Sequence, residues 1–128
     1  MQTHWTFTRL DAGATADETR HVSPPSPGPW RLERAHLLPN ATSTEHADNY
    51  ATITIKNGSD TLASRDTQEG EGGTLTAATA APLTLAGGKA REVTGITGAV
   101  EIEKTHAGTG VAVDVEVCCE WTKLREQG

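Results

Sequence analysis

The chain has 128 residues, a formal charge of −6 at pH 7, 35% hydrophobic residues and only 4% aromatic residues. That length fits one domain, and its scattered basic residues argue against nucleic acid, which is bound mainly by clustered Lys and Arg. An acidic surface also disfavours anionic membranes, and no stretch reaches the roughly 18 apolar residues of a membrane span. We therefore expect neither nucleic acid nor a membrane as a partner.

The N-terminal segment predicts a strand followed by a linker. Residues 2–10 alternate loosely, with Trp5, Phe7 and Arg9 on one side. Residues 23–29 then hold four prolines, including Pro24 and Pro25. Because proline cannot continue a helix or donate to a central ladder, this stretch predicts an extended, partly polyproline linker. We therefore divide the chain into an N-terminal strand and Pro-rich arm, residues 1–29, and a sandwich domain, residues 30–128.

The middle of the chain predicts several strands. Residues 30–38 change parity between Leu32 and Leu37, which indicates a β-bulge or a strand that twists across an edge. Residues 50–56 alternate cleanly, and Asn57-Gly58 is a strong turn signal before a returning strand. The inward residues of the alternating strand are expected to be Ala51, Ile53 and Ile55.

The run from residue 111 to residue 121 places valines, Cys119 and Trp121 on one parity and acidic residues with Cys118 on the other. It predicts a long strand with one buried and one wet face. Residues 100–103 also alternate, and the Gly-containing connection at 104–110 predicts a β-hairpin between the two runs. We expect Cys118 on the outer face or under a neighbouring subunit. About eight strands at this spacing predict an all-β, antiparallel, jelly-roll-like β-sandwich with an extended N-terminal arm.

No catalytic or metal-binding pattern stands out in the sequence. The histidines lack zinc-ligand spacing, no serine lies in a Gly-x-Ser-x-Gly elbow, and the glycine-rich acidic loop at 68–73 lacks the spacing of a calcium loop. A site assembled from His36, His46 and His106 is left open as the weaker interpretation. We expect no enzyme, no metal and no cofactor. The N-terminus lacks the features of a signal peptide, and the only two cysteines are sequence neighbours, which favours a reducing compartment.

These observations leave binding and assembly. An aromatic side chain beside an extended arm is a good anchor for a partner surface, and the alternative is that it fastens the arm to its own sandwich. The residues that we expect to contact a partner are Trp5, Phe7, Arg9, Pro24, Pro25, Trp30 and Cys118.

Three stretches resemble small structural proteins of tailed-bacteriophage heads. They are residues 35–42 leading to 49–55, residues 73–75 running into 81–85, and residues 104–113. The resemblance spans residues 30–122 and implies a β-sandwich or jelly-roll protein on the capsid exterior, as a decoration protein or in a fibre.

The resemblance further implies a non-enzymatic virion protein, assembled in the bacterial host cytoplasm, that binds the major capsid protein and stabilises the head. We expect the sandwich base and the N-terminal arm to make this contact. It also implies a homo-oligomer, with a trimer as the natural expectation. Deletion of residues 1–29 is then expected to leave a folded sandwich that binds capsids poorly. The alternative function is a carbohydrate- or receptor-binding module of a phage fibre or tail.

Overall fold

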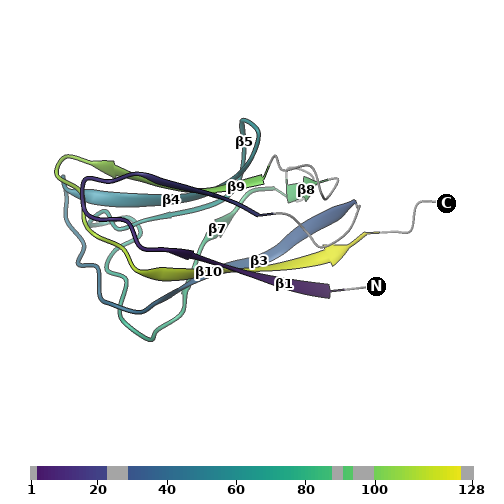
Figure 1. Cartoon of the computed structure of the whole chain (residues 1–128), viewed down its shortest axis with the longest axis horizontal. Coiled ribbons are helices and arrows are strands. Elements are labelled where there is room, and N and C mark those ends of the chain that lie inside the picture. The colour runs from purple at the N-terminus through teal and green to yellow at the C-terminus, as the bar shows by residue number, and fades with distance from the viewer. Residues whose placement is uncertain (1–2, 23–28, 88–90, 94–99, 125–128) are drawn as a thin grey trace.

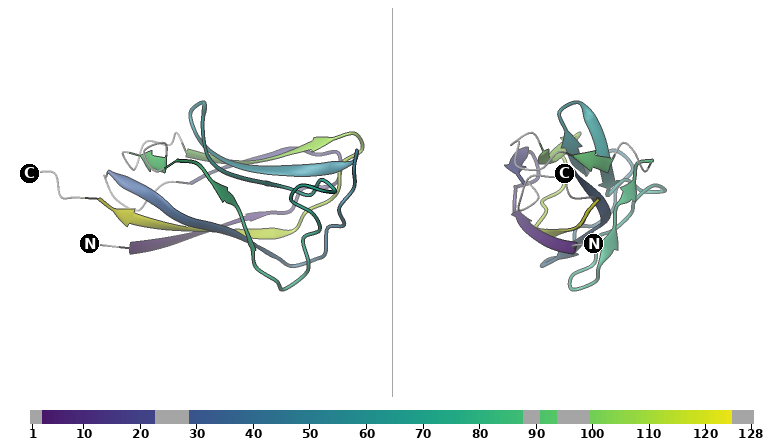
Figure 2. Two further views of the ribbon diagram at one scale, coloured as in Figure 1. Left: turned by 180° about the vertical axis from the view of Figure 1, so that it is seen from behind. Right: turned by 90° about the vertical axis from the view of Figure 1, so that its right-hand side faces the viewer.

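The computed structural model describes residues 3–22, 29–87, 91–93 and 100–124. Two antiparallel sheets pack face to face (Figures 1 and 2). Sheet A has the order β1 (Thr3–Leu10), β10 (Val115–Lys123), β3 (Trp30–Pro39) and β6 (Ala81–Pro82), and β8 (Glu92–Val93) also pairs with β3. Sheet B has the order β2 (Glu18–His21), β9 (Val100–Ala107), β4 (Tyr50–Asn57), β5 (Asp60–Asp66) and β7 (Thr84–Leu85). The all-β antiparallel sandwich expected from the sequence is confirmed.

The core lies between the sheets and follows the alternation of the long strands. Ala51, Ile53 and Ile55 of β4 are at most 1% exposed, as predicted. From the opposite sheet, Cys119 and Trp121 of β10 are fully buried, which also confirms the predicted inner parity of that strand. The indole Nε1–H of Trp121 donates to the hydroxyl of Thr6 in β1 (2.9 Å), so the polar atom of this buried ring has a partner.

Two local predictions are confirmed by the strand register. The pairing of β10 with β3 shifts between Glu120 and Trp121, whose partners are Arg34 and Leu32, so Glu33 is the extra residue of a bulge. The bulge explains why the apolar parity of β3 changes along the strand. The turn between β4 and β5 contains Gly58 at φ 63°, a conformation that glycine adopts without a steric penalty.

The hairpin predicted between residues 100 and 121 is wrong. β9 pairs with β2 and β4 in sheet B, whereas β10 pairs with β1 and β3 in sheet A. The connection from Gly108 to Asp114 therefore crosses from one sheet to the other. Alternation reports which side chains share a face, but two consecutive strands of a sandwich alternate equally well when they belong to different sheets. The strand itself begins at Val115 and not at Val111.

The N-terminal segment is part of the sandwich and not an arm held away from it, which corrects the boundary expected at residue 29. All eight residues of β1 pair with β10, and β2 pairs with β9. Figure 1 shows β1 beside β10 along its length. Each sheet thus takes one edge strand from the first 21 residues of the chain. The segment 23–28, which contains Pro24 and Pro25, lies outside the described residues.

A buried lysine fastens the connection between these two strands. The Lys104 side chain of β9 is completely buried, and its Nζ donates to the backbone carbonyls of Gly13, Ala14 and Ala16 at 2.9, 3.0 and 2.6 Å. An ammonium carries three N–H donors, so this geometry satisfies all of them. Sequence reasoning did not identify this cluster, because residue 104 was assigned to a polar connection, where a lysine is expected to face solvent.

Candidate functional site

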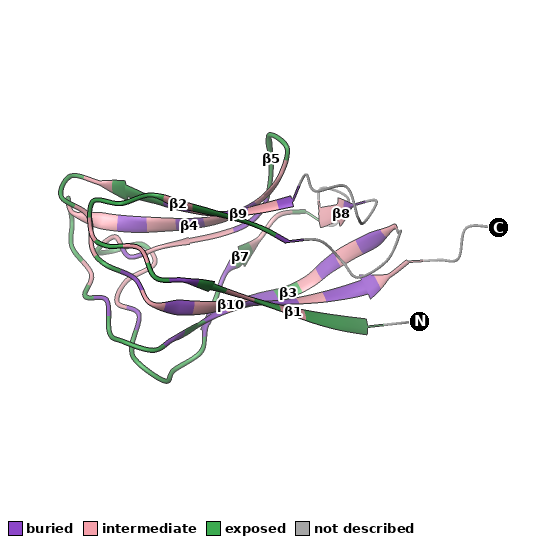
Figure 3. Cartoon of the chain, in the orientation of Figure 1, coloured by how far each residue is buried: buried purple, intermediate pink, exposed green. Residues whose placement is uncertain are grey.

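Among the described residues, the large apolar side chains that stay exposed gather on the outer face of sheet A. Trp5 and Phe7 of β1 are 42% and 65% exposed, and Leu38 of β3 is 40% exposed. Figure 3 shows β1 largely coloured as exposed beside the mostly buried β10. We call the outward residues of this region the aromatic face: Trp5, Phe7, His36, Leu38 and Pro82.

The rings of the aromatic face contact one another across three strands. Trp5 and Phe7 lie nearly parallel, at 13°, with centroids 6.3 Å apart. Trp5 also meets His36 of β3 edge-on at 5.9 Å, so the indole leans over the central strand β10. An exposed cluster of this kind is a typical centre of a protein interface, because large rigid rings give contact area at low entropic cost.

Cys118 lies on this face but is not accessible. Its register partners are Phe7 on one side and His36 on the other, and it is only 4% exposed. Burial, with a smaller contribution from the charge of Glu116, raises the pKa of its thiol. The outer placement predicted from parity is confirmed, but the wet environment is not, since side chains of the same chain cover this sulfur.

Most of the charges that border the aromatic face are paired within the chain. The Arg9 guanidinium donates through two nitrogens to the Asp114 carboxylate, at 3.2 Å each. Arg34 Nε lies 3.1 Å from Glu120 Oε1. Between Arg9 and Leu38 in the register, Glu116 Oε2 is buried and has no hydrogen-bond partner among the described residues. The face is thus apolar at its centre, and its border carries two internal ion pairs and the Glu116 carboxylate.

The seven residues expected to contact a partner have different outcomes. Trp5, Phe7 and Arg9 come together on one surface. Trp30 does not: it is fully buried in the core, with the His4 ring edge-on at 5.4 Å, so the sandwich itself covers this indole. The interpretation that an aromatic side chain fastens the N-terminal segment to its own sandwich is the one that holds for Trp30. Pro24 and Pro25 lie outside the described residues.

Leu38 was missed by sequence reasoning, which considered His36 only together with His46 and His106. In the pair Leu37-Leu38 only one side chain can point inward, and Leu37, at 0% exposure, takes that place. The bulge at Glu33 sets this parity. The bulge and the two adjacent leucines together could therefore have identified Leu38 as an exposed apolar residue.

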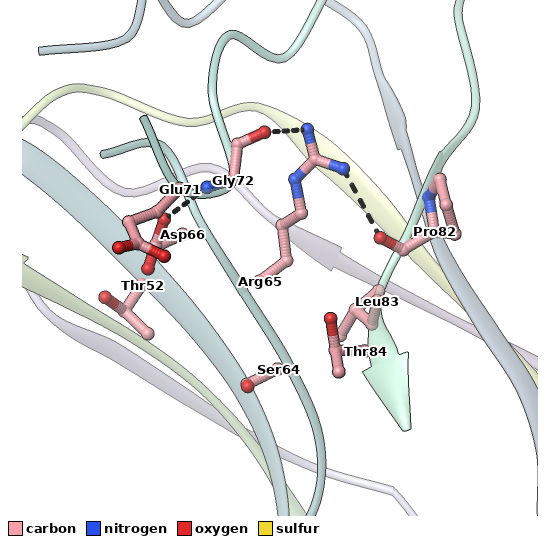
Figure 4. A pocket seen from close by; sticks show the side chains of 9 residues that line it. All are labelled: Thr52, Ser64, Arg65, Asp66, Glu71, Gly72, Pro82, Leu83 and Thr84. Atoms are coloured by element: carbon pink, nitrogen blue, oxygen red, sulfur yellow. Dashed lines mark hydrogen bonds between the residues drawn. The ribbon is translucent and has the colours of Figure 1, made fainter. Parts of the chain in front are cut away.

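A cavity of about 440 Å³ lies on the sheet B side, beside β5 and β7 (Figure 4). Two of its charged residues, Arg65 and Asp66, hold the surrounding loops together. Arg65 donates to the carbonyls of Gly72 (2.6 Å) and Pro82 (3.4 Å), as Figure 4 shows, and Asp66 Oδ1 accepts from the N–H of Gly72 (2.9 Å). Because these side chains bond to the backbone of the same chain, we interpret the cavity as a gap stabilised by loop contacts and not as a prepared ligand site.

The remaining titratable groups are also dispersed. His106 Nδ1 lies 2.6 Å from Asp17 Oδ1, and His46 Nδ1 accepts the N–H groups of Asp48 and Asn49. His36 contacts Trp5, so the three histidines considered together in the sequence act in separate places. No group of three or more potential metal ligands occurs among the residues that the structure describes.

The sequence matches no protein-family model and no curated protein. Within the described residues there is no helix with the length and apolarity of a membrane span.

Proposed function

We propose that this chain is a non-enzymatic structural protein that docks onto a protein surface through the aromatic face of sheet A. Trp5, Phe7 and Leu38 are the large hydrophobic side chains that stay exposed among the described residues, and their concentration on one side of one sheet is the observation that carries the proposal. Scattered exposed apolar residues are ordinary, whereas a contiguous patch marks an interaction surface.

In its specific form, the proposal is that the aromatic face docks onto the exterior of a phage capsid, where its partner is the major capsid protein. The support for this form is the resemblance of residues 30–122 to head proteins of tailed phages. The trimer that the same resemblance implies stays a prediction. A sandwich whose described residues form no prepared ligand pocket suits a protein whose role is to bind and stabilise a shell.

The chemistry of the face predicts how such binding responds to salt. Arg9 and Arg34 are already paired with carboxylates of their own chain, so few unpaired charges border the apolar centre. Apolar burial would then supply most of the affinity, and screening of charges would matter little. We expect binding to change by less than about tenfold between low and high salt.

The test uses phage heads assembled without this chain, from a genome in which its gene is deleted, and measures cosedimentation of added full-length protein. Trp5→Ser and Phe7→Ser should each weaken binding by about 30-fold, the equivalent of about 2 kcal/mol. Glu103→Gln, on the outer face of sheet B, is the control and should bind like the wild type. Absence of wild-type binding, or unchanged binding by both serine variants, would contradict the proposal.

A second candidate function is carbohydrate binding by a fibre or tail module. The observation that favours it is the exposed, nearly parallel pair of Trp5 and Phe7, since the C–H face of a sugar ring packs on aromatic faces. A glycan array with the wild-type chain tests it. Binding that Phe7→Ser abolishes would support this function, and a wild-type chain without hits would remove it.

A further inference from the structure

The open edge of sheet A carries backbone groups that no described strand uses. β1 begins the sheet order and pairs with β10 on one side only. Continuing the register of these two strands, Val113 N–H donates to the carbonyl of Ala12 at 3.1 Å. Hydrogen-bonded and non-hydrogen-bonded pairs alternate along an antiparallel ladder. It follows that Thr6 and Thr8 bond to β10, while the intervening odd-numbered residues direct their N–H and C=O groups away from it.

The other neighbour of β10 supports this assignment. Asn40 N–H donates to the carbonyl of Asp114 at 2.7 Å, in the register that joins β3 to β10. Even-numbered residues of β10 therefore bond to β3, which leaves its odd-numbered residues for β1. Trp5, Phe7 and Arg9 thus present donors and acceptors along the edge of the sheet that no described strand uses.

Among the described strands, β1 is the unprotected edge. The edge strands β6 and β7 have two residues each, and β2 has four. Short edges, charges and prolines are the usual ways in which proteins prevent strand addition. β1 has eight residues, none of them proline or lysine, and its one arginine is bound to Asp114. An edge of this length and composition is suited to pair with a further strand.

We propose that β1 pairs antiparallel with β1 of a second copy, about a twofold axis at Thr6. This register places Trp5 opposite Phe7 of the second copy, Thr3 opposite Arg9, and Thr6 opposite itself. The odd-numbered residues, whose backbone groups face outward, meet one another in hydrogen-bonded pairs. No like charges lie opposite each other, and aromatic cross-strand pairs stabilise a sheet. The strand is therefore complementary to itself.

The pairing joins the two copies of sheet A into one continuous sheet. Trp5 and Phe7 of both copies form a cluster of four rings on its outer face. Edge pairing adds a neighbour beside the aromatic face and not above it, so that face remains open in the dimer. The pairing of two copies therefore does not depend on docking to a capsid. A twofold contact of this kind is isologous and closes at two copies, in contrast to the trimer that the phage resemblance implies.

Sedimentation analysis and amide exchange of the full chain in solution test the pairing. We expect the mass of two chains at high concentration. In the dimer, the amides of Trp5, Phe7 and Arg9 should exchange at least about tenfold more slowly than at dilutions where the chain is monomeric. The amides of Thr6 and Thr8 should be protected at both concentrations, because β10 already binds them. A monomer at every concentration up to millimolar, a trimer, or a dimer in which the three odd-numbered amides stay unprotected would overturn the proposal.

A matched pair of variants isolates the backbone contribution. Phe7→Leu and Phe7→Pro both remove the ring, but only the proline removes the outward N–H, and proline is tolerated on the open side of an edge strand. Phe7→Leu should still form dimers at high concentration, whereas Phe7→Pro should be a folded monomer. A Phe7→Pro chain that dimerises like the leucine variant would contradict the pairing. If the proline variant fails to fold, the amide-exchange result on the wild-type chain decides the question.

Discussion

Substitution of the buried lysine tests how the N-terminal strands are held. Lys104→Met keeps most of the side-chain volume and removes three hydrogen bonds to the carbonyls of the β1–β2 connection. Three bonds from a charged donor, at about 1.5 kcal/mol each, contribute about 4.5 kcal/mol. Removal of the ammonium also relieves its desolvation, which Asp17 and Glu18 partly offset in the folded chain, so the net loss is smaller than this sum. We therefore expect the free energy of unfolding to fall by about 3 kcal/mol.

Urea unfolding followed by tryptophan fluorescence measures this change, provided that the slope of the transition is unchanged. Lys56→Met is the matched control, because Lys56 lies on the neighbouring strand β4 and forms a partly exposed ion pair with Glu103 at 3.4 Å. Its loss should cost less than about 0.5 kcal/mol. A Lys104→Met variant within about 1 kcal/mol of the wild type would refute the assignment of Lys104 as the fastening of this connection.

Three further predictions follow from the packing of sheet A and its edges. Burial raises the pKa of Cys119 to about 12 from 9.0, so between these pH values only the unfolded chain loses the thiol proton. The stability that the buried thiol contributes is therefore complete below pH 9 and declines as the pH rises towards 12. A Cys119→Val chain should lack this part of the alkaline decline when its free energy of unfolding is measured in urea. Thr6→Val removes the acceptor of the Trp121 indole and should lower the free energy of unfolding by about 1–2 kcal/mol in the same assay, whereas the surface change Thr61→Val should leave it nearly unchanged. Deletion of residues 1–29 removes both β1 and β2 and should abolish the cooperative thermal transition; a truncated chain that unfolds cooperatively would contradict the assignment of these strands to the sandwich.

The fold class was predictable because it depends on local patterns. The alternation of β4 and β10 identified their buried faces, and the parity change in β3 identified its bulge. The sheet to which a strand belongs depends on contacts between distant residues, which alternation does not encode. For this reason the hairpin before β10 was predicted wrongly, and the pairing of β1 with β10 was not recognised.

The candidate site was predictable in part. Trp5, Phe7 and Arg9 stood out because they share one parity in a segment close to the terminus. Leu38 and His36 belong to the same surface only because β10 lies between β1 and β3, an arrangement with no local signature. Trp30 was misplaced for a related reason: its position beside a Pro-rich stretch indicated exposure, whereas its place at the start of β3 puts it in the core.

Site-specific photocross-linking during phage assembly tests the docking proposal most directly. The full-length chain carries a photoreactive phenylalanine analogue at position 7, on the aromatic face, or at position 61, where exposed Thr61 lies in β5 of sheet B. We predict a cross-link to the major capsid protein from position 7 and none from position 61. Cross-links to the capsid protein from position 61 alone, or virions that lack the chain altogether, would contradict the proposal that the aromatic face of sheet A docks onto the capsid.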